Sequence, residues 1–296
     1  NGWDCIAGNA PGKQIIAVGG AKGGVGKSAL SANLAVGLAL MGYRVVLADL
    51  DLGGADVHLY VGVKSLKRNW NDFIDKKVDT IEQIQTPTAF KGLSVLGGNA
   101  SRLGNANLAY HQKLKIMRHL RALESDFIIM DLGGDTSYNV LDFFLLADRK
   151  IVVTGTEPAS ILDTYSFIKV AFHRFLDRFF AKYESLQHMR LQLRKGLSFK
   201  AGEVTLDSIF EQVRAQNLTA YVDLKEQFEK YQVSLIVNMV ESRKDLSYAK
   251  SMIQLVKDTC ALDLEMLGMI PFDTAVRRAA RRFTPFVVED PRSKPS

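Results

Sequence analysis

The sequence predicts an α/β protein with a doubly wound, mostly parallel sheet of seven to eight strands and helices on both faces. Short apolar runs recur along the chain, each ending in Gly, Asp or Asn, and stretches with helical periodicity separate most of them. Continuous apolar runs are typical of strands buried on both faces. With 296 residues, 47% hydrophobic and 24% charged, the chain has enough material for one large core.

Seven apolar runs are expected to be strands, and three stretches with period 3.6 are expected to be helices. The strands are predicted at 15–18, 45–48, 93–96, 127–130, 151–153, 234–237 and 267–270. The helices are predicted at 28–41, which Gly42 closes, at 110–123 and at 247–260. Strands that alternate with helices in this way form a parallel sheet.

One segment, around 163–232, interrupts this alternation. It contains a long helical pattern rich in Phe and Tyr, then a basic loop, then two further helical segments. We expect its aromatic residues to face the core of the protein. The chain is therefore predicted to be a single domain over 1–296 with a mainly helical insertion.

Charge and cysteine content restrict the function. The net charge is +6, and the two cysteines, Cys5 and Cys260, are too far apart in sequence to suggest a disulfide framework, a zinc site or an iron–sulfur site. We therefore expect a cytoplasmic protein. No apolar run approaches the roughly 18 residues that a bilayer span needs. The basic excess gathers in two clusters, one with Arg190, Arg194, Lys195 and Lys200, the other with Arg277, Arg278, Arg281, Arg282, Arg292 and Lys294.

A glycine-rich loop, GGAKGGVGKS at 19–28, follows the first expected strand and leads into a helix. This is the setting of a phosphate-binding loop, in which backbone N–H groups and the helix N-terminus hold the phosphates. Lys27 would reach the β and γ phosphates, and the Ser28 hydroxyl would bind Mg²⁺. Ala21 replaces the first glycine of the usual pattern, whereas Lys22 adds a second lysine. The residues of this loop expected to bind a nucleotide are Gly23, Gly24, Val25, Gly26, Lys27, Ser28 and Ala29.

Three aspartates follow expected strands, at the sheet edge where open α/β sheets bind ligands. Asp49 and Asp51 follow the second strand, and alternation along an extended chain would point their side chains to the same side. One carboxylate would then hold Mg²⁺ through water while the other orients an attacking water. Asp131 follows the strand at 127–130 and precedes a glycine turn, and we expect it to bind Mg²⁺ through water.

Residues 22–28, KGGVGKS, resemble the deviant Walker A motif of the MinD/ParA family of P-loop ATPases. The resemblance implies that Lys22 reaches across a dimer interface to the nucleotide of the other subunit, so Lys22 and Lys27 become candidate catalytic residues. It also identifies Asp51 as the catalytic, water-positioning residue of a first switch. Asp49 then lies on the metal side with Ser28 and Asp131, and the second switch supplies backbone N–H groups from Gly133 and Gly134.

Three later segments resemble the same family, most closely its MinD and FlhG (FleN) branch. Residues 152–165, VVTGTEPASILDTY, resemble the family's TPEPxxxxDAY stretch. Asn238 stands where a strand-end asparagine meets the adenine base. Residues 268–273, GMIPFD, resemble a nucleotide-rim segment and make Pro271 and Asp273 nucleotide-binding candidates. The matches extend from about 15 to 286, apart from the insertion.

The resemblance implies a positioning or regulatory ATPase that uses ATP and Mg²⁺. Its ATP form would be a homodimer that binds a surface and a protein partner, and slow, partner-stimulated hydrolysis would release both. The basic clusters could meet an anionic membrane or non-specific DNA, which would place the ATP form peripherally at the membrane or nucleoid, or they could be solvated helix faces with local ion pairs.

The alternative function is a metabolic enzyme on the same phosphate-binding loop, such as an ATP-dependent ligase of the cobyrinic acid synthase kind. Such an enzyme needs a dedicated small-molecule pocket, and no residues in the sequence identify one. An electron-transfer ATPase is disfavoured because the cysteines are unpaired.

Overall fold

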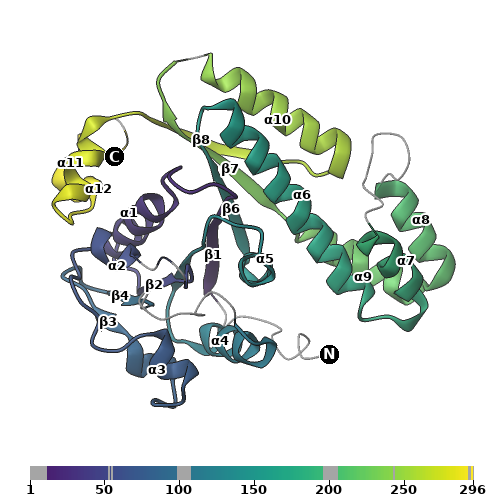
Figure 1. The fold of residues 1–296 in the computed structure, drawn as a ribbon, viewed down its shortest axis with the longest axis horizontal. Helices are drawn as coiled ribbons and strands as arrows, with labels where there is room; N and C mark the ends of the chain where they lie inside the picture. The colour runs from purple at the N-terminus through teal and green to yellow at the C-terminus, as the bar shows by residue number, and fades with distance from the viewer. Residues whose placement is uncertain are drawn as a thin grey trace.

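The computed structural model describes residues 12–52, 54, 56–98, 108–195, 206–242, 244–292 and 295. Within these residues eight strands form one sheet, in the order β3-β4-β2-β5-β1-β6-β7-β8 (Figure 1). The strands are β1 (Gln14–Gly19), β2 (Val45–Asp49), β3 (Thr86–Pro87), β4 (Leu93–Leu96), β5 (Phe127–Asp131), β6 (Arg149–Thr154), β7 (Val233–Val240) and β8 (Glu265–Pro271). The seven predicted strands and the predicted fold class are confirmed.

All neighbouring strands pair in parallel except β3, which pairs antiparallel with β4 at the edge of the sheet. The sequence did not predict β3, because two residues carry no periodicity. Its Pro87 is tolerated because an edge strand can spare a backbone donor. At the centre, β1 lies between β5 and β6. The carboxyl ends of β1, β2 and β5 therefore meet at one edge of the sheet.

Helices cover both faces of the sheet, as predicted. α1 (Lys27–Leu40) packs on β1, β2, β4 and β5, and α2 (Val57–Tyr60) and α12 (Phe286–Glu289) pack on α1. The other face carries α5 (Tyr138–Leu146), α6 (Pro158–Phe180) and α10 (Asp245–Cys260), and α4 (Tyr110–Ala122) packs beside α5. Figure 1 shows α6 and α10 running side by side. Two further helices are α3 (Trp70–Ile74) and α11 (Thr274–Arg281), and one 3-10 turn is η2 (Ile81–Ile84).

The segment predicted as an insertion is mainly helical in the residues that the structure describes. The long helix α6 begins at Pro158, before the expected boundary at 163, and its far end carries α7 (Gln187–Arg194), α8 (Leu206–Gln216) and α9 (Leu218–Glu229) (Figure 1). A 3-10 turn, η3 (Glu184–Leu186), connects α6 to α7. One buried cluster of side chains continues from the sheet into this region. The predicted core role of the aromatic residues is confirmed, since Phe167, Phe172, Phe179 and Phe180 are buried.

The expectation of a basic loop after the long helical pattern is wrong for Arg190 and Arg194, because residues 187–194 form α7. Leu186 and Met189 are buried and Leu193 packs against the core. Their spacing of three and four residues gives this short segment one apolar face, which favours a helix. Lys200, like Cys5 and Lys294, lies outside the described residues.

The sequence predicted no segment that spans a bilayer, and the described helices can be judged by their length and apolar character. None of them combines the length and the apolar character that crossing a bilayer requires.

Replacing Phe172 by Ala should destabilise the fold strongly. Phe172 is fully buried, and the ring centroids of Phe175, Phe228 and Tyr231 lie 6.1, 6.1 and 5.7 Å from its own. The cavity left by the ring should lower the free energy of unfolding by about 3–5 kcal/mol in urea denaturation. Leu162→Ala, at a position on the same helix that is 60% exposed, should change it by less than about 0.5 kcal/mol. Equal losses in the two variants would contradict this packing.

Candidate phosphate-binding site

Glycines of the loop between β1 and α1 have backbone conformations that residues with a side chain rarely adopt. Gly24 and Gly26 have φ angles of 81° and 93°, in the left-handed region. A Cβ at Gly26 would also overlap the amide of Asn238. That amide nitrogen donates a hydrogen bond of 2.8 Å to the carbonyl oxygen of Val25. Asn238, predicted to meet an adenine base, therefore holds the loop itself.

Lys27, the first residue of α1, lies beneath the loop and is only 7% exposed. Its Nζ donates to the carbonyl oxygen of Lys22 at 2.9 Å. Burial lowers the pKa of Lys27, although the charges of Asp131 and Asp51 oppose this shift. Gly134 touches the same loop, since a Cβ there would lie 3.0 Å from the backbone nitrogen of Gly23 and 3.1 Å from Lys27 Nζ. The predicted second-switch glycine thus contacts the lysine.

Lys22 differs from Lys27 because it does not line the cavity beside the loop, and its side chain pairs with an acid instead. Its Nζ forms an ion pair of 3.2 Å with Oε2 of Glu157, the residue before α6. Both side chains are solvent-accessible, with 37% of Lys22 and 75% of Glu157 exposed. An exposed pair of this kind contributes about 0–1 kcal/mol and is easily exchanged for another partner.

Asp49 and Asp131 lie opposite each other in the register of β2 and β5, and both are buried. Ser31 Oγ donates to Asp131 Oδ1 at 2.8 Å. The two oxygens of Asp49 accept from the backbone nitrogens of Asp51, at 3.2 Å, and Val57, at 3.0 Å. Burial, followed by the charge of Asp131, raises the pKa of Asp49 well above its ordinary value.

The pKa of Asp131 is raised to about 6. Burial is the main cause, and hydrogen bonds from Ser28 and Ser31 together with the charge of Lys27 offset only part of it. The negative charge of this carboxylate is therefore undercompensated in the protein alone. A nearby divalent cation would favour the ionised form.

Asp51 occupies a different position from Asp49, although the sequence predicted a shared side. β2 ends at Asp49, so strand alternation does not extend to Asp51. The carboxylate of Asp51 accepts from the backbone nitrogen of Gly54 at 3.1 Å and lines the open cavity. A Cβ on Gly133 would lie 3.4 Å from Asp51 Cγ. Asp51 therefore lies beside Gly133, one of the two predicted second-switch glycines.

These elements enclose a cavity of about 410 Å³, within the range of small-molecule sites. The structure brings together here most of the predicted residues, but Lys22, Val25, Asp49, Asp131 and Gly133 do not line it. Its predicted lining residues are Gly23, Gly24, Gly26, Lys27, Ser28, Ala29, Asp51, Gly134, Asn238, Pro271 and Asp273. Asp273 also caps α11, accepting from the backbone nitrogen of Ala275 at 2.8 Å.

Several residues of the site were missed by sequence reasoning. Ser31 lies three residues after Ser28, on the same side of α1, and that spacing could have identified it. The indole nitrogen of Trp70 donates to the carbonyl oxygen of Asp49 at 2.7 Å, a contact that no motif predicts. Met239, whose φ of 60° is unusual, lines the cavity where the pairing of β7 with β8 is irregular.

The carboxy-terminal basic cluster divides into separate environments. Arg277 lines the cavity, and Arg282 forms an ion pair of 2.6 Å with Glu289. Arg278 and Arg281 are exposed on α11. The cluster is therefore partly a wall of the phosphate-binding site and partly a surface with local ion pairs.

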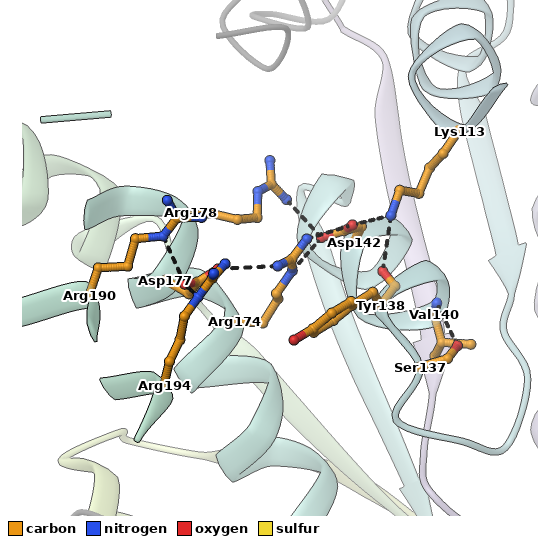
Figure 2. Close-up of polar contacts among 10 residues, drawn as sticks. All are labelled: Lys113, Ser137, Tyr138, Val140, Asp142, Arg174, Asp177, Arg178, Arg190 and Arg194. Atoms are coloured by element: carbon orange, nitrogen blue, oxygen red, sulfur yellow. Dashed lines mark hydrogen bonds and ion pairs between the residues drawn. The ribbon is translucent and has the colours of Figure 1, made fainter. Parts of the chain in front are cut away.

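Arg190 and Arg194 of the other basic cluster are fixed by ion pairs within the protein (Figure 2). Asp177 Oδ1 accepts from Arg190 Nε at 3.0 Å and from Arg194 Nε at 2.6 Å, and its Oδ2 accepts from Arg174 Nη1 at 3.2 Å. Asp142 is fully buried and pairs with Arg174 at 2.8 Å and with Arg178 at 3.9 Å. These ion pairs form the arginine cluster, which consists of Arg174, Arg178, Arg190 and Arg194 with Asp142 and Asp177.

The arrangement suits a nucleotide with Mg²⁺. The loop and Lys27 would offer donors to phosphates, and Ser28 and Asp131 would offer the oxygen ligands and hydrogen-bond acceptors that Mg²⁺ and its waters prefer. In the described part of the chain no three His, Cys, Asp or Glu side chains form a metal cage. Mg²⁺ bound together with phosphates commonly takes only one or two carboxylates.

Comparisons with known proteins show the family of the chain. The model of the CobQ/CobB/MinD/ParA nucleotide binding domain matches residues 16–286. The chain is similar to the antiactivator FleN of Pseudomonas aeruginosa, with 31% identity over 159 residues, 53% of this chain and 56% of FleN. It is similar to the septum site-determining protein MinD of Helicobacter pylori, with 28% identity over 51% of this chain and 56% of MinD. The chain thus spans about half the length of these relatives.

A solved structure shows the same fold. It is the septum site-determining protein MinD complexed with Mg-ADP from Pyrococcus horikoshii OT3, with a TM-score of 0.61 and 20% identity. The match covers 95% of this chain and 90% of that one.

Asp131→Asn should make the ligand-free chain more stable at pH 8. In the wild type, the pKa of about 6 against an ordinary 3.8 means that the contribution of Asp131 to stability is fully present below pH 3.8 and is lost as the pH rises to 6. The neutral amide avoids the buried charge, so urea denaturation should show a gain of about 1–3 kcal/mol at pH 8. The gain should shrink towards zero below pH 4.

Asp126→Asn is the matched control, because Asp126 is a carboxylate outside the site whose pKa is held low by hydrogen bonds from Arg44. It should bring no gain in stability at pH 8. If Asp131→Asn were less stable than the wild type at pH 8, the conclusion that the buried charge of Asp131 destabilises the ligand-free chain would be wrong.

Proposed function

The chain belongs to the CobQ/CobB/MinD/ParA family of nucleotide-binding domains, and we propose that it is an ATPase that works as a dimerisation switch. Its Mg-ATP form joins two chains, and slow hydrolysis separates them. The observation that carries this proposal is the position of Lys22. A second loop lysine that does not line the cavity of its own chain is free to serve the nucleotide of another chain.

ATP and Mg²⁺ are the ligands proposed for the site. The P. horikoshii relative is complexed with Mg-ADP. In this chain the phosphate-binding loop and Lys27 would hold the phosphates. Ser28 and Asp131 would hold Mg²⁺ and its waters. Asp49 would assist them by fixing the segment that follows β2. When bound, Mg²⁺ would neutralise charge on the phosphate oxygens.

Asp51 is proposed to orient the attacking water. Its carboxylate lines the cavity beside Gly133, on the side where Gly134 approaches Lys27. It can accept a hydrogen bond from a water placed in line with the γ-phosphate. Gly133 and Gly134 would donate hydrogen bonds from their backbone N–H groups to that phosphate. The conformation of the segment after β5 would therefore depend on whether the γ-phosphate is present. In the dimer, Lys22 would exchange Glu157 for the partner's phosphates.

The cellular role is proposed from relatives whose names describe antiactivation and the determination of a septum site. The chain would position or regulate a cellular structure, with a protein partner that stimulates hydrolysis. Exposed Arg278 and Arg281 on α11 would bring the ATP form to an anionic surface, either membrane lipid or DNA. A ligase of the cobyrinic acid synthase kind is the alternative, and it requires a second substrate rather than a dimer.

Lys27→Ala and Lys22→Ala should separate nucleotide binding from dimerisation. Lys27→Ala should weaken Mg-ATP binding at least roughly tenfold in isothermal titration calorimetry, because a hydrogen bond to a charged group is worth about 1.5–3 kcal/mol. Lys22→Ala should leave the affinity of the monomer within about threefold of the wild type. The assignment of the two lysines would be wrong if both variants bound Mg-ATP equally well.

Asp51→Ala should trap a dimer in Mg-ATP but not in Mg-ADP, because nucleotide would bind without being hydrolysed. Light scattering after size exclusion would measure the mass, and adding Lys22→Ala should return it to that of a monomer. Lys67→Ala, which removes another exposed lysine, and Glu157→Ala, which removes the partner of Lys22 within the chain, should both leave the dimer intact. If the mass were the same in Mg-ATP and in Mg-ADP, the dimerisation switch would be wrong and the ligase alternative would be favoured.

A further inference from the structure

A buried tryptophan joins the ends of β2 and β4 at the phosphate-binding edge. The ladder between these two strands ends at Ala48 and Leu96. Trp70, the first residue of α3, takes up the two carbonyl groups that come next along the strands. Its indole nitrogen donates to the carbonyl oxygen of Asp49 at 2.7 Å, and its backbone nitrogen donates to that of Gly97 at 3.0 Å. One residue therefore fixes both strand ends beyond the ladder.

Trp70 itself is held firmly. Its side chain is fully buried, and it directly follows the residue that caps α3. In that cap, Asn69 Oδ1 accepts from the backbone nitrogen of Asn71 at 3.0 Å, and Asp72 Oδ2 accepts from the backbone nitrogen of Asn69 at 3.1 Å. Reciprocal bonds of this kind fix the start of a helix. The indole N–H is thus presented to β2 from a rigid support.

Asp49 transmits the position of the strand end to Asp51. Its carbonyl oxygen accepts from Trp70, while its carboxylate Oδ1 accepts from the backbone nitrogen of Asp51 at 3.2 Å. Its Oδ2 accepts from the backbone nitrogen of Val57 at 3.0 Å, where α2 begins. The segment that carries Asp51 is therefore held near both of its ends by a residue that Trp70 holds in turn.

The hydrogen bond from the indole is directional, so it controls more than packing. The carbonyl group that accepts it belongs to Asp49, which is only 1% exposed. A buried carbonyl oxygen that loses its donor stays unsatisfied unless its peptide group turns towards another donor. Asp51 follows this peptide group by two residues, and its carboxylate lines the cavity. Turning the peptide group would therefore displace that carboxylate.

We propose that Trp70 is a positioning residue for the hydrolysis of ATP. It fixes the carbonyl group of Asp49, and through Asp49 it keeps the carboxylate of Asp51 where it can orient the attacking water. Trp70 does not line the cavity, so it acts on the rate of the chemical step and not on the affinity for the nucleotide. This inference rests on the proposed ATPase function and adds a residue to it.

The test compares the release of phosphate from Mg-ATP by the full chain and by Trp70→Phe, which keeps a buried aromatic ring but lacks the indole N–H. We expect kcat to fall at least about tenfold, because a displacement of about 1 Å in an active site can cost about a hundredfold. KM should stay within about twofold of the wild type, the pattern of an interaction that matters only in the transition state.

Phe73→Leu is the matched control on the same helix. Phe73 is fully buried, and its ring centroid lies 3.9 Å from Lys115 Nζ and 4.9 Å from the ring centroid of His119, both on α4. This variant should lose stability in urea, as Trp70→Phe does, and keep kcat within about twofold of the wild type. The inference is overturned if Trp70→Phe folds and keeps its kcat, if it changes KM alone, or if Phe73→Leu loses kcat to the same extent.

A second measurement decides the inference if Trp70→Phe does not fold by circular dichroism. The sequence has two tryptophans, so Trp3→Phe leaves the indole of Trp70 alone in the chain. Its Nε1–H signal in a proton–nitrogen NMR spectrum should exchange slowly with deuterium and shift saturably with Mg-ADP. A signal that Mg-ADP leaves in place would overturn the inference. A wild type that releases no phosphate would instead contradict the ATPase function, and the indole signal would still decide whether Trp70 is linked to the site.

Discussion

Two carboxylates buried side by side at the ends of β2 and β5 determine how the phosphate-binding edge is built. Parallel pairing places Asp49 directly beside Asp131, and each is held by donors from a different element. Asp131 takes a hydroxyl from α1, whereas Asp49 fixes the chain leading into α2 through two backbone N–H groups. The first switch and α1 are thereby both held in place by hydrogen bonds to this pair of aspartates. A cation added at this edge would relieve their repulsion and so act on both elements together.

The segment from Asp131 to Tyr138 connects the two charged regions of the molecule. It begins at a buried acid, passes the glycines that touch Lys27 and Asp51, and ends at a tyrosine whose ring centroid lies 4.4 Å from the guanidinium of Arg174. Lys113 spans the end of this segment, since its Nζ contacts both the carbonyl oxygen of Tyr138 and the buried Asp142. The phosphate-binding loop and the arginine cluster are therefore joined by one short segment of the chain.

Local patterns predicted most of the fold and the loop, because apolar runs and glycine spacing are local properties. The seven long strands, α1 and the helical character of the insertion follow from such patterns. Contacts between distant segments could not be predicted in this way. The bond from Asn238 to Val25 joins residues 213 positions apart, and the pairing of Arg190 and Arg194 with Asp177 depends on how α7 folds back onto α6. The separate positions of Asp49 and Asp51 depend on where β2 ends.

The helix α6 extends from the phosphate-binding edge to the helices α7, α8 and α9. It runs without interruption for 23 residues, about 35 Å, from Pro158 to Phe180. Glu157, which holds Lys22, stands at its first end, and Arg174 and Arg178 of the arginine cluster lie in its last turns. A tilt of about 5° would carry the far end through about 3 Å. A small movement of Glu157 at the nucleotide edge would thus become a larger displacement of α7, α8 and α9 at the far end of α6.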